Sequence, residues 1–204
     1  MVNSVNPDRI EGQKTGAFEV FDVLGRAPDY HVVPVGNAGN YSAYFKGYLE
    51  DFNEGRIKQV PRMYGYQAEG SAPFVHGGPV KNPDTIATAI RIGNPASWDL
   101  AQSAMECSVG KFGAVSDAEI LWMHRFLSQE TGVFVEPSSA TGAAGIYKAS
   151  KQGESFAGAL IVVTVTGHGL KDPMWALKDE EGNEISPEAV STNAAEVAER
   201  LGLA

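Results

Sequence analysis

A five-residue segment, Gly36 to Asn40, has the residue types and spacing to bind a phosphate group. It follows the apolar run at residues 30–35 and leads into a helical pattern that begins near Tyr41. Such a turn presents backbone N–H groups at the positive end of a helix, and its glycines let an anion approach the backbone. The segment matches neither the GxGxxG fingerprint nor a GxxxxGK[ST] loop. An ordinary strand-to-helix turn explains the glycines equally well, so both interpretations stay open.

The composition restricts the partners of the chain. Its 204 residues are 43% hydrophobic and carry a formal net charge of −9, which argues against a nucleic-acid partner. Apolar runs of the roughly 20 residues that cross a bilayer are absent, and the N-terminal residues do not have the layout of a signal peptide. We therefore expect a cytoplasmic protein with no membrane partner. The single cysteine, Cys107, excludes an internal disulfide and a multi-cysteine metal site, so we expect no metal.

Helices and strands alternate along the chain. Asn6 before Pro7 is typical of a helix start, Ser116 with Glu119 matches a capping box, and Gly25 and Gly132 are suited to end helices. The predicted helices span residues 7–24, 41–52, 83–90, 97–108, 117–131, 139–151 and 187–201, and the predicted strands span residues 30–35, 62–67, 133–136 and 159–166.

Most of these strands are apolar without a period of two, which indicates a parallel sheet buried on both faces. We therefore predict an α/β fold with three layers, α/β/α, in which residues 1–204 form a single cofactor-binding domain. In such sheets, ligands bind outside the carboxyl ends of the strands. That rule selects three loops for a binding site: residues 36–40, 136–139 and 166–172.

Five segments resemble the threonine synthases, which are pyridoxal-phosphate enzymes of fold type II. They are NSVNPDRIEGQKT (3–15), PVGNAGN (34–40), IATAIRIGNPASW (86–98), VFVEPSSA (133–140) and TVTGHGLKD (164–172). The segments occur in the family's order and cover most of the chain. The resemblance implies the large-domain fold of that class, pyridoxal 5′-phosphate as cofactor, and a homodimer. The implied reaction converts O-phospho-L-homoserine and water into L-threonine and phosphate, the last step of threonine biosynthesis.

The same resemblance assigns roles to individual residues. The cofactor phosphate would be held by Gly36, Asn37, Ala38, Gly39 and Asn40. Thr166 would face the pyridine nitrogen, where a neutral hydroxyl can bond an unprotonated nitrogen and favours elimination and replacement chemistry. The phosphate of the substrate would be bound by Asn3, Ser4 and Arg9.

One feature of the family has no counterpart in this sequence. The lysine that binds the cofactor covalently lies, in the family, before everything matched here, and none of the lysines of this chain has the Ser/Thr-x-Ser-Phe-Lys-Asp setting. We therefore expect the C-terminal part of a longer enzyme, with no catalytic residue of its own and no activity alone. Two alternatives are another fold type II lyase, such as a serine or threonine dehydratase, and a non-catalytic truncated product. The runs at residues 3–9 and 166–172 argue against the dehydratase. The sequence does not separate the threonine synthase part from the truncated product, because both would have the same residues.

Overall fold

The computed structural model describes residues 6–178, 183–186 and 189–203. The chain divides into two compact units, residues 1–172 and residues 173–204. All four strands belong to the first unit, which therefore contains the sheet and its surrounding helices. A single domain over residues 1–204 stays a prediction.

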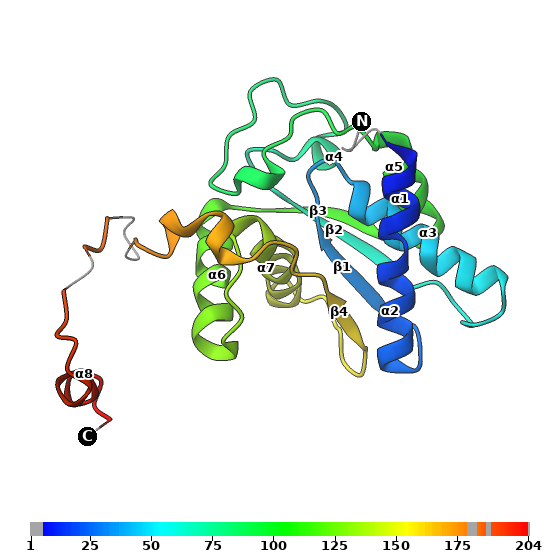
Figure 1. The fold of residues 1–204 in the computed structure, drawn as a ribbon. Helices are drawn as coiled ribbons and strands as arrows, with labels where there is room; N and C mark the ends of the chain where they lie inside the picture. The colour runs from blue at the N-terminus through cyan, green and yellow to red at the C-terminus, as the bar shows by residue number, and fades with distance from the viewer. Residues whose placement is uncertain (1–5, 179–182, 187–188, 204) are drawn as a thin grey trace. The chain divides into compact units, whose positions relative to one another are not determined.

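The first unit is organised around one parallel sheet. Its strands are β1 (Tyr30–Pro34), β2 (Arg62–Ala68), β3 (Lys111–Val115) and β4 (Ile161–Val163), in the order β3-β2-β1-β4 (Figure 1). The chain adds β2 and then β3 on one side of β1, and it returns to place β4 on the other side. The gap between β1 and β4 is therefore a topological switch point, where ligands bind in folds of this type.

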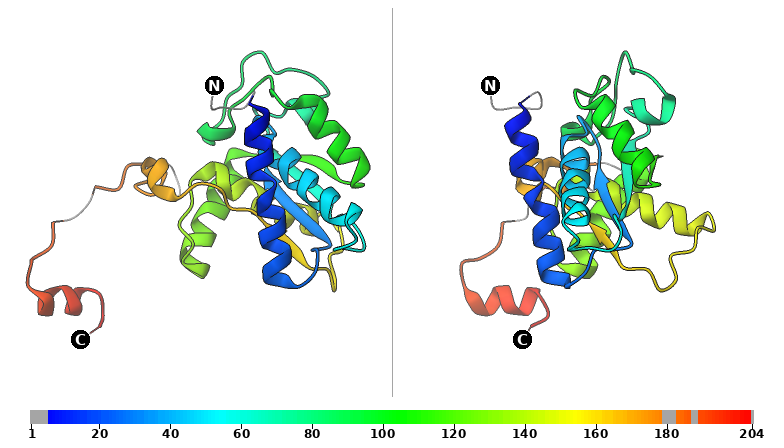
Figure 2. Two further views of the ribbon diagram at one scale, coloured as in Figure 1. Left: turned by 45° about the vertical axis from the view of Figure 1, so that its right-hand side comes forward. Right: turned by 90° about the vertical axis from the view of Figure 1, so that its right-hand side faces the viewer.

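Helices cover both faces of the sheet, as the three-layer prediction requires. One face carries α1 (Pro7–Gln13), α2 (Thr15–Leu24), α3 (Gly39–Asn53) and α5 (Trp98–Cys107), and the other carries α6 (Asp117–Thr131) and α7 (Pro137–Lys151) (Figures 1 and 2). Adjacent residues of β1 serve the two layers: Val33 packs with the α3 side and Val32 with the α7 side. Because both are fully buried, β1 is apolar without alternation.

Predicted helix caps are confirmed. The side chain of Asn6 accepts a hydrogen bond from the N–H of Asp8 at 3.0 Å, and Ser116 and Glu119 form both bonds of a capping box. Gly25 and Gly132 end α2 and α6 in the left-handed conformation.

The predicted helix at residues 7–24 is divided into α1 and α2 at Lys14, whose carbonyl accepts from the N–H of Ala17 in a tight turn. The division lies where the helices cross α3. A Cβ atom at Gly47 would overlap the Lys14 carbonyl, so the absence of a side chain there permits the close approach.

The predicted strand at residues 133–136 is wrong, and β3 takes its place in the sheet. Between α6 and α7, which pack together, the chain has too few residues to reach the sheet, and Val135 forms only an isolated antiparallel bridge with His168. The sequence pattern missed β3 because the strand is short and contains a lysine and Gly113. A Cβ at Gly113 would lie 2.6 Å from Cε1 of Tyr66, so a small residue is needed at this close contact.

Two further helix predictions differ from the structure. Residues 83–90 contain only a 3₁₀ turn, η1 (Thr88–Ile90), because the Asp117 carboxylate holds the segment by accepting from the N–H of Ile86 and the hydroxyl of Thr85. The predicted helix at 187–201 is α8 (Ala194–Arg200), and residues 187–188 lie outside the described residues. The remaining short elements are α4 (Pro73–His76), η2 (Gly169–Lys171) and η3 (Pro173–Trp175). In the described part of the chain, no helix is long and apolar enough to cross a membrane.

Candidate functional site

A cavity of about 170 Å³ lies at the carboxyl ends of β1 and β4. Its wall contains the loop that follows β1, Thr166 after β4, and part of α1. The structure therefore brings together the predicted residues Arg9, Gly36, Asn37, Ala38, Gly39, Asn40 and Thr166. Asn3 and Ser4, predicted to bind the substrate phosphate, lie outside the described residues. The cavity occupies the switch point of the sheet, which is where the fold itself predicts a ligand.

The loop delivers an uncapped helix N-terminus to this cavity. α3 has 15 residues, and its N-cap residue, Ala38, makes no side-chain cap hydrogen bond. Ala38 has a φ of 64°, a left-handed conformation that is uncommon for alanine, and its carbonyl accepts from the Ser42 hydroxyl at 3.0 Å. The first N–H groups of a helix have no acceptor within the helix. The start of α3 therefore has the geometry that binds anions such as phosphate in other proteins, as the sequence predicts for this loop.

The two glycines of the loop have different surroundings. A Cβ at Gly36 would lie 3.0 Å from the Cα of Ile90 and 3.0 Å from Cδ1 of Ile92, so the protein itself leaves little space there. A Cβ at Gly39 would meet nothing closer than Gln13 Oε1 at 3.8 Å and Ile10 Cδ1 at 3.9 Å, which is ordinary contact. Packing therefore explains Gly36, whereas the open space at Gly39 is available to a ligand.

Asn37 holds the neighbouring segment in place. Its side-chain oxygen accepts from the N–H of Ala96 at 3.1 Å, and its carbonyl accepts from the N–H of Ser97 at 3.2 Å. These bonds tie the loop after β1 to the start of α5. The carbonyl group of the Asn37 side chain is thus used within the protein.

Thr166 is held from α7. The hydroxyls of Thr166 and Ser139 are 2.8 Å apart, and Ser139 Oγ also accepts from the N–H of Gly167 at 2.6 Å. The next residue back, Ser138, accepts from the N–H of Ala89 at 3.1 Å. The rule for parallel sheets predicts a site at the loop of residues 136–139, but no sequence pattern gave either serine a role. The consecutive hydroxyls at the start of a helix were the available signal.

The loop around Thr166 is paired with the segment before α7. The N–H of Glu136 donates to the Gly167 carbonyl at 2.9 Å, and the N–H of Gly169 donates to the Phe134 carbonyl at 3.1 Å. A Cβ at Gly167 would overlap the Glu136 carboxyl group. Burial raises the pKa of that carboxyl, while the positive charge of Lys171 opposes the rise. Glycine at 167 therefore permits the packing that places Thr166 at the cavity.

Arg9 is an exposed residue of α1 at the rim of the cavity. With its amide oxygen turned toward Arg9, the Gln13 side chain accepts from Arg9 Nε at 3.1 Å, and its amide nitrogen lies 3.1 Å from Asn40 Oδ1. This arrangement connects Arg9 to the loop at the start of α3. His168, which lies outside the cavity wall, accepts from the N–H of Leu170 at 3.1 Å and so stabilises a turn.

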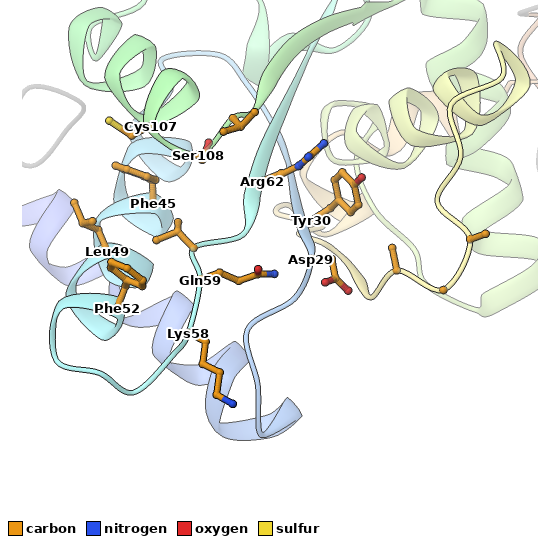
Figure 3. A pocket seen from close by; sticks show the side chains of 15 residues that line it. Asp29, Tyr30, Phe45, Leu49, Phe52, Lys58, Gln59, Arg62, Cys107 and Ser108 are labelled. Carbon is orange, nitrogen blue, oxygen red and sulfur yellow. The ribbon is translucent and has the colours of Figure 1, made fainter.

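A larger cavity, of about 850 Å³, lies at the opposite edge of the sheet (Figure 3). Tyr30 and Arg62, the first residues of β1 and β2, contribute to its wall together with apolar side chains of α3. It contains none of the predicted site residues. Because parallel α/β sheets bind ligands at their carboxyl ends, the smaller cavity is the candidate site. The described residues contain no group of three or more His, Cys, Asp or Glu side chains that could hold a metal ion.

A parallel sheet with helices on both faces, and with a cavity at its switch point, defines an α/β domain of the doubly wound class. The chain belongs to the family of pyridoxal-phosphate dependent enzymes, whose model matches residues 1–167.

Threonine synthases are similar to this chain in sequence. The enzyme of Mycobacterium tuberculosis is 56% identical over 204 residues, which are 100% of this chain and 56% of the relative. Threonine synthase of Synechocystis sp. is 54% identical over 91% of this chain and 48% of the relative. That of Methanocaldococcus jannaschii is 46% identical over 89% of this chain and 47% of the relative. The chain thus spans about half the length of the curated relatives it matches.

Solved structures share the fold at lower identity. A fungal L-serine ammonia-lyase from Rhizomucor miehei has a TM-score of 0.67 and 23% identity, over 78% of this chain and 51% of that chain. Serine racemase from Dictyostelium discoideum has a TM-score of 0.63 and 21% identity, over 80% and 51%. At this level of identity the similarity shows the fold, which is that of the fold type II pyridoxal-phosphate enzymes.

Proposed function

We propose that this chain is the cofactor-binding part of a threonine synthase, which converts O-phospho-L-homoserine and water into L-threonine and phosphate. The observation that carries the proposal is the 56% identity with a threonine synthase over the whole chain. The cavity at the switch point supports it, because it joins an uncapped helix N-terminus to a hydroxyl group in one small space.

The residues of the cavity fit pyridoxal 5′-phosphate. The N–H groups at the start of α3 would bind its phosphate, and the Thr166 hydroxyl would bond its ring nitrogen. When bound, the cofactor supplies an electron sink for elimination and replacement at the substrate. Arg9 at the rim would bind the substrate phosphate with its planar guanidinium group, together with Asn3 and Ser4.

This chain would bind and orient the cofactor and the substrate, while the proton transfers would depend on a lysine outside it. None of its lysines has the sequence setting of the family's cofactor-binding lysine. The active form would therefore include the N-terminal half found in the relatives. We further propose a cytoplasmic homodimer, which is the assembly implied by the resemblance.

The dehydratase alternative has weaker support. Threonine deaminase and L-serine ammonia-lyase share the fold at 19% and 23% identity, which carries no information on the substrate. The threonine synthases are 46% to 56% identical to this chain. The non-catalytic alternative has the same residues as the proposal, so the activity test below is needed to separate the two.

The test joins this chain to the N-terminal part of the M. tuberculosis threonine synthase and measures products from three substrates. We expect equal amounts of L-threonine and phosphate from O-phospho-L-homoserine, and no ammonia from L-serine or L-threonine. Ammonia from either amino acid would favour the dehydratase. A folded, cofactor-loaded hybrid without any product would favour the non-catalytic alternative.

A second measurement uses the 204-residue chain alone. After incubation with pyridoxal phosphate and reduction by borohydride, peptide mapping should find no lysine labelled in a one-to-one ratio. Such a label on one lysine, together with turnover by the chain alone, would show that the cofactor-binding lysine lies within this chain, contrary to the proposal.

A further inference from the structure

The hydroxyl of Ser139 contacts the Thr166 hydroxyl but does not line the cavity. Ser139 is in the first turn of α7 and has no exposed surface. Among the described residues, its Oγ atom has two hydrogen-bond partners, the N–H of Gly167 at 2.6 Å and the hydroxyl of Thr166 at 2.8 Å. Thr166 itself is exposed and lines the cavity.

The direction of these hydrogen bonds follows from the chemistry of the groups. A backbone N–H only donates, so Ser139 Oγ accepts from Gly167. If Thr166 also donated to Ser139, the Ser139 proton would be buried without an acceptor, which is costly. The arrangement that satisfies every group has Ser139 donating to Thr166. The proton of the Thr166 hydroxyl is then free to be donated into the cavity.

We propose that Ser139 is a positioning residue that makes the Thr166 hydroxyl a hydrogen-bond donor to the cavity, so that the site selects an unprotonated aromatic nitrogen. The inference rests on the proposed function, because the nitrogen is that of the cofactor ring. Ser139 acts through Thr166 and does not line the cavity. Its place in the first turn of a helix fixes the position of its oxygen, because the backbone there is held by the N–H of Ser139 donating to the Glu136 carbonyl at 2.9 Å.

The test compares two ligands that need no lysine. The first is 4′-deoxypyridoxine 5′-phosphate, and the second is its carbocyclic analogue, in which a C–H group replaces the ring nitrogen. Both are titrated calorimetrically into the hybrid protein described above. The ratio of the two affinities measures the bond to the ring nitrogen, because the phosphate contacts are common to both ligands.

Ser139→Ala should lower this ratio by about fivefold, which corresponds to one net hydrogen bond between neutral groups. In a Thr166→Val background the same substitution should change the ratio no further, because the group through which Ser139 acts is gone. Thr141→Val is the control. It removes the hydroxyl of another fully buried residue of α7, which neither lines the cavity nor bonds Thr166. It should leave the ratio unchanged.

The outcomes separate the role of Ser139 from the placement of the cofactor in the cavity. A wild-type hybrid that binds the two ligands equally, or binds neither, would overturn the placement of the cofactor and the role of Ser139 with it. A wild-type hybrid that prefers the nitrogen ligand, and a Ser139→Ala variant with the same preference, would overturn the role of Ser139 alone. Equal losses of affinity for both ligands in Ser139→Ala would show a purely structural serine.

Discussion

The substitution Gly39→Asp separates ligand binding from folding. A Cβ at Gly39 would be in ordinary contact with Ile10 Cδ1 at 3.9 Å and Gln13 Oε1 at 3.8 Å, so the protein accommodates a side chain there. An acidic residue at the start of α3 also interacts favourably with the helix dipole, by about 0.3–1 kcal/mol. We therefore expect the variant to fold with a melting temperature equal to or above that of the wild type.

Binding of a phosphate ligand should instead be weakened. Ile10 and Gly39 both line the cavity, so the new carboxylate would occupy the space of the phosphate and bond the same N–H groups. Two charges at ~4 Å repel by about 1 kcal/mol in water and by about 4 kcal/mol at an effective dielectric constant of about 20. The affinity should therefore fall between about fivefold and about a thousandfold for each charge on the phosphate.

The measurement is calorimetric titration of 4′-deoxypyridoxine 5′-phosphate into the hybrid protein, with thermal unfolding recorded in parallel. Gly39→Asn is the control, because it has the same shape without the charge and should lose less affinity. Equal affinities of Gly39→Asp and Gly39→Asn for the ligand would refute the prediction, since the start of α3 would then hold no anion.

Two further predictions concern stability. Gly145→Ala should lower the free energy of unfolding by about 1–3 kcal/mol, because a Cβ there would overlap the Tyr66 ring. Gly142→Ala should be neutral or stabilising, because its Cβ would have ordinary contacts at 3.4 Å and 3.5 Å. Equal denaturation midpoints for the two variants would contradict this prediction. Burial lowers the pKa of His31 from 6.5 to about 3, and its ring nitrogens bond Tyr48 at 2.9 Å and Thr164 at 2.7 Å. Between pH 6.5 and pH 3 the unfolded chain binds a proton at His31 that the folded state does not bind. The free energy of unfolding should therefore fall with decreasing pH in this range, by at most about 1.4 kcal/mol per pH unit from this group. The stability difference between wild type and His31→Phe should narrow over that range, and a constant difference would refute the assignment.

Local sequence patterns predicted most of the elements of this protein. The caps at Asn6 and Ser116 are made by side chains that bond their own helix within two or three residues, so the pattern contains the whole interaction. The strand β1 was recognisable because Val32, Val33 and Pro34 are apolar without alternation, as burial on both faces of a sheet favours. The glycine loop could be read as a phosphate site or as a turn, and the uncapped start of α3 at the cavity supports the first interpretation.

The strand at residues 133–136 shows where local patterns are insufficient. An apolar run suggests a buried strand, but Val133 is exposed here, Phe134 packs edge-on against His124 of α6 and His168, and Val135 is buried beside the His168 loop. Conversely, β3 contains Gly113 because the Tyr66 ring of the neighbouring strand occupies the space of a side chain. Neither fact is present in the local sequence.

The sequence by itself determined the positions of most helices and singled out the loop at residues 36–40 and, through the family resemblance, Thr166, which the structure places in one cavity. Only the tertiary structure decided that Ser139 lies 2.8 Å from Thr166, and that Arg9 and Asn40 meet at Gln13. These contacts join residues from separate elements, so they depend on the strand order β3-β2-β1-β4. Helix and strand periods report which face of an element is buried, but they do not report which other element covers it.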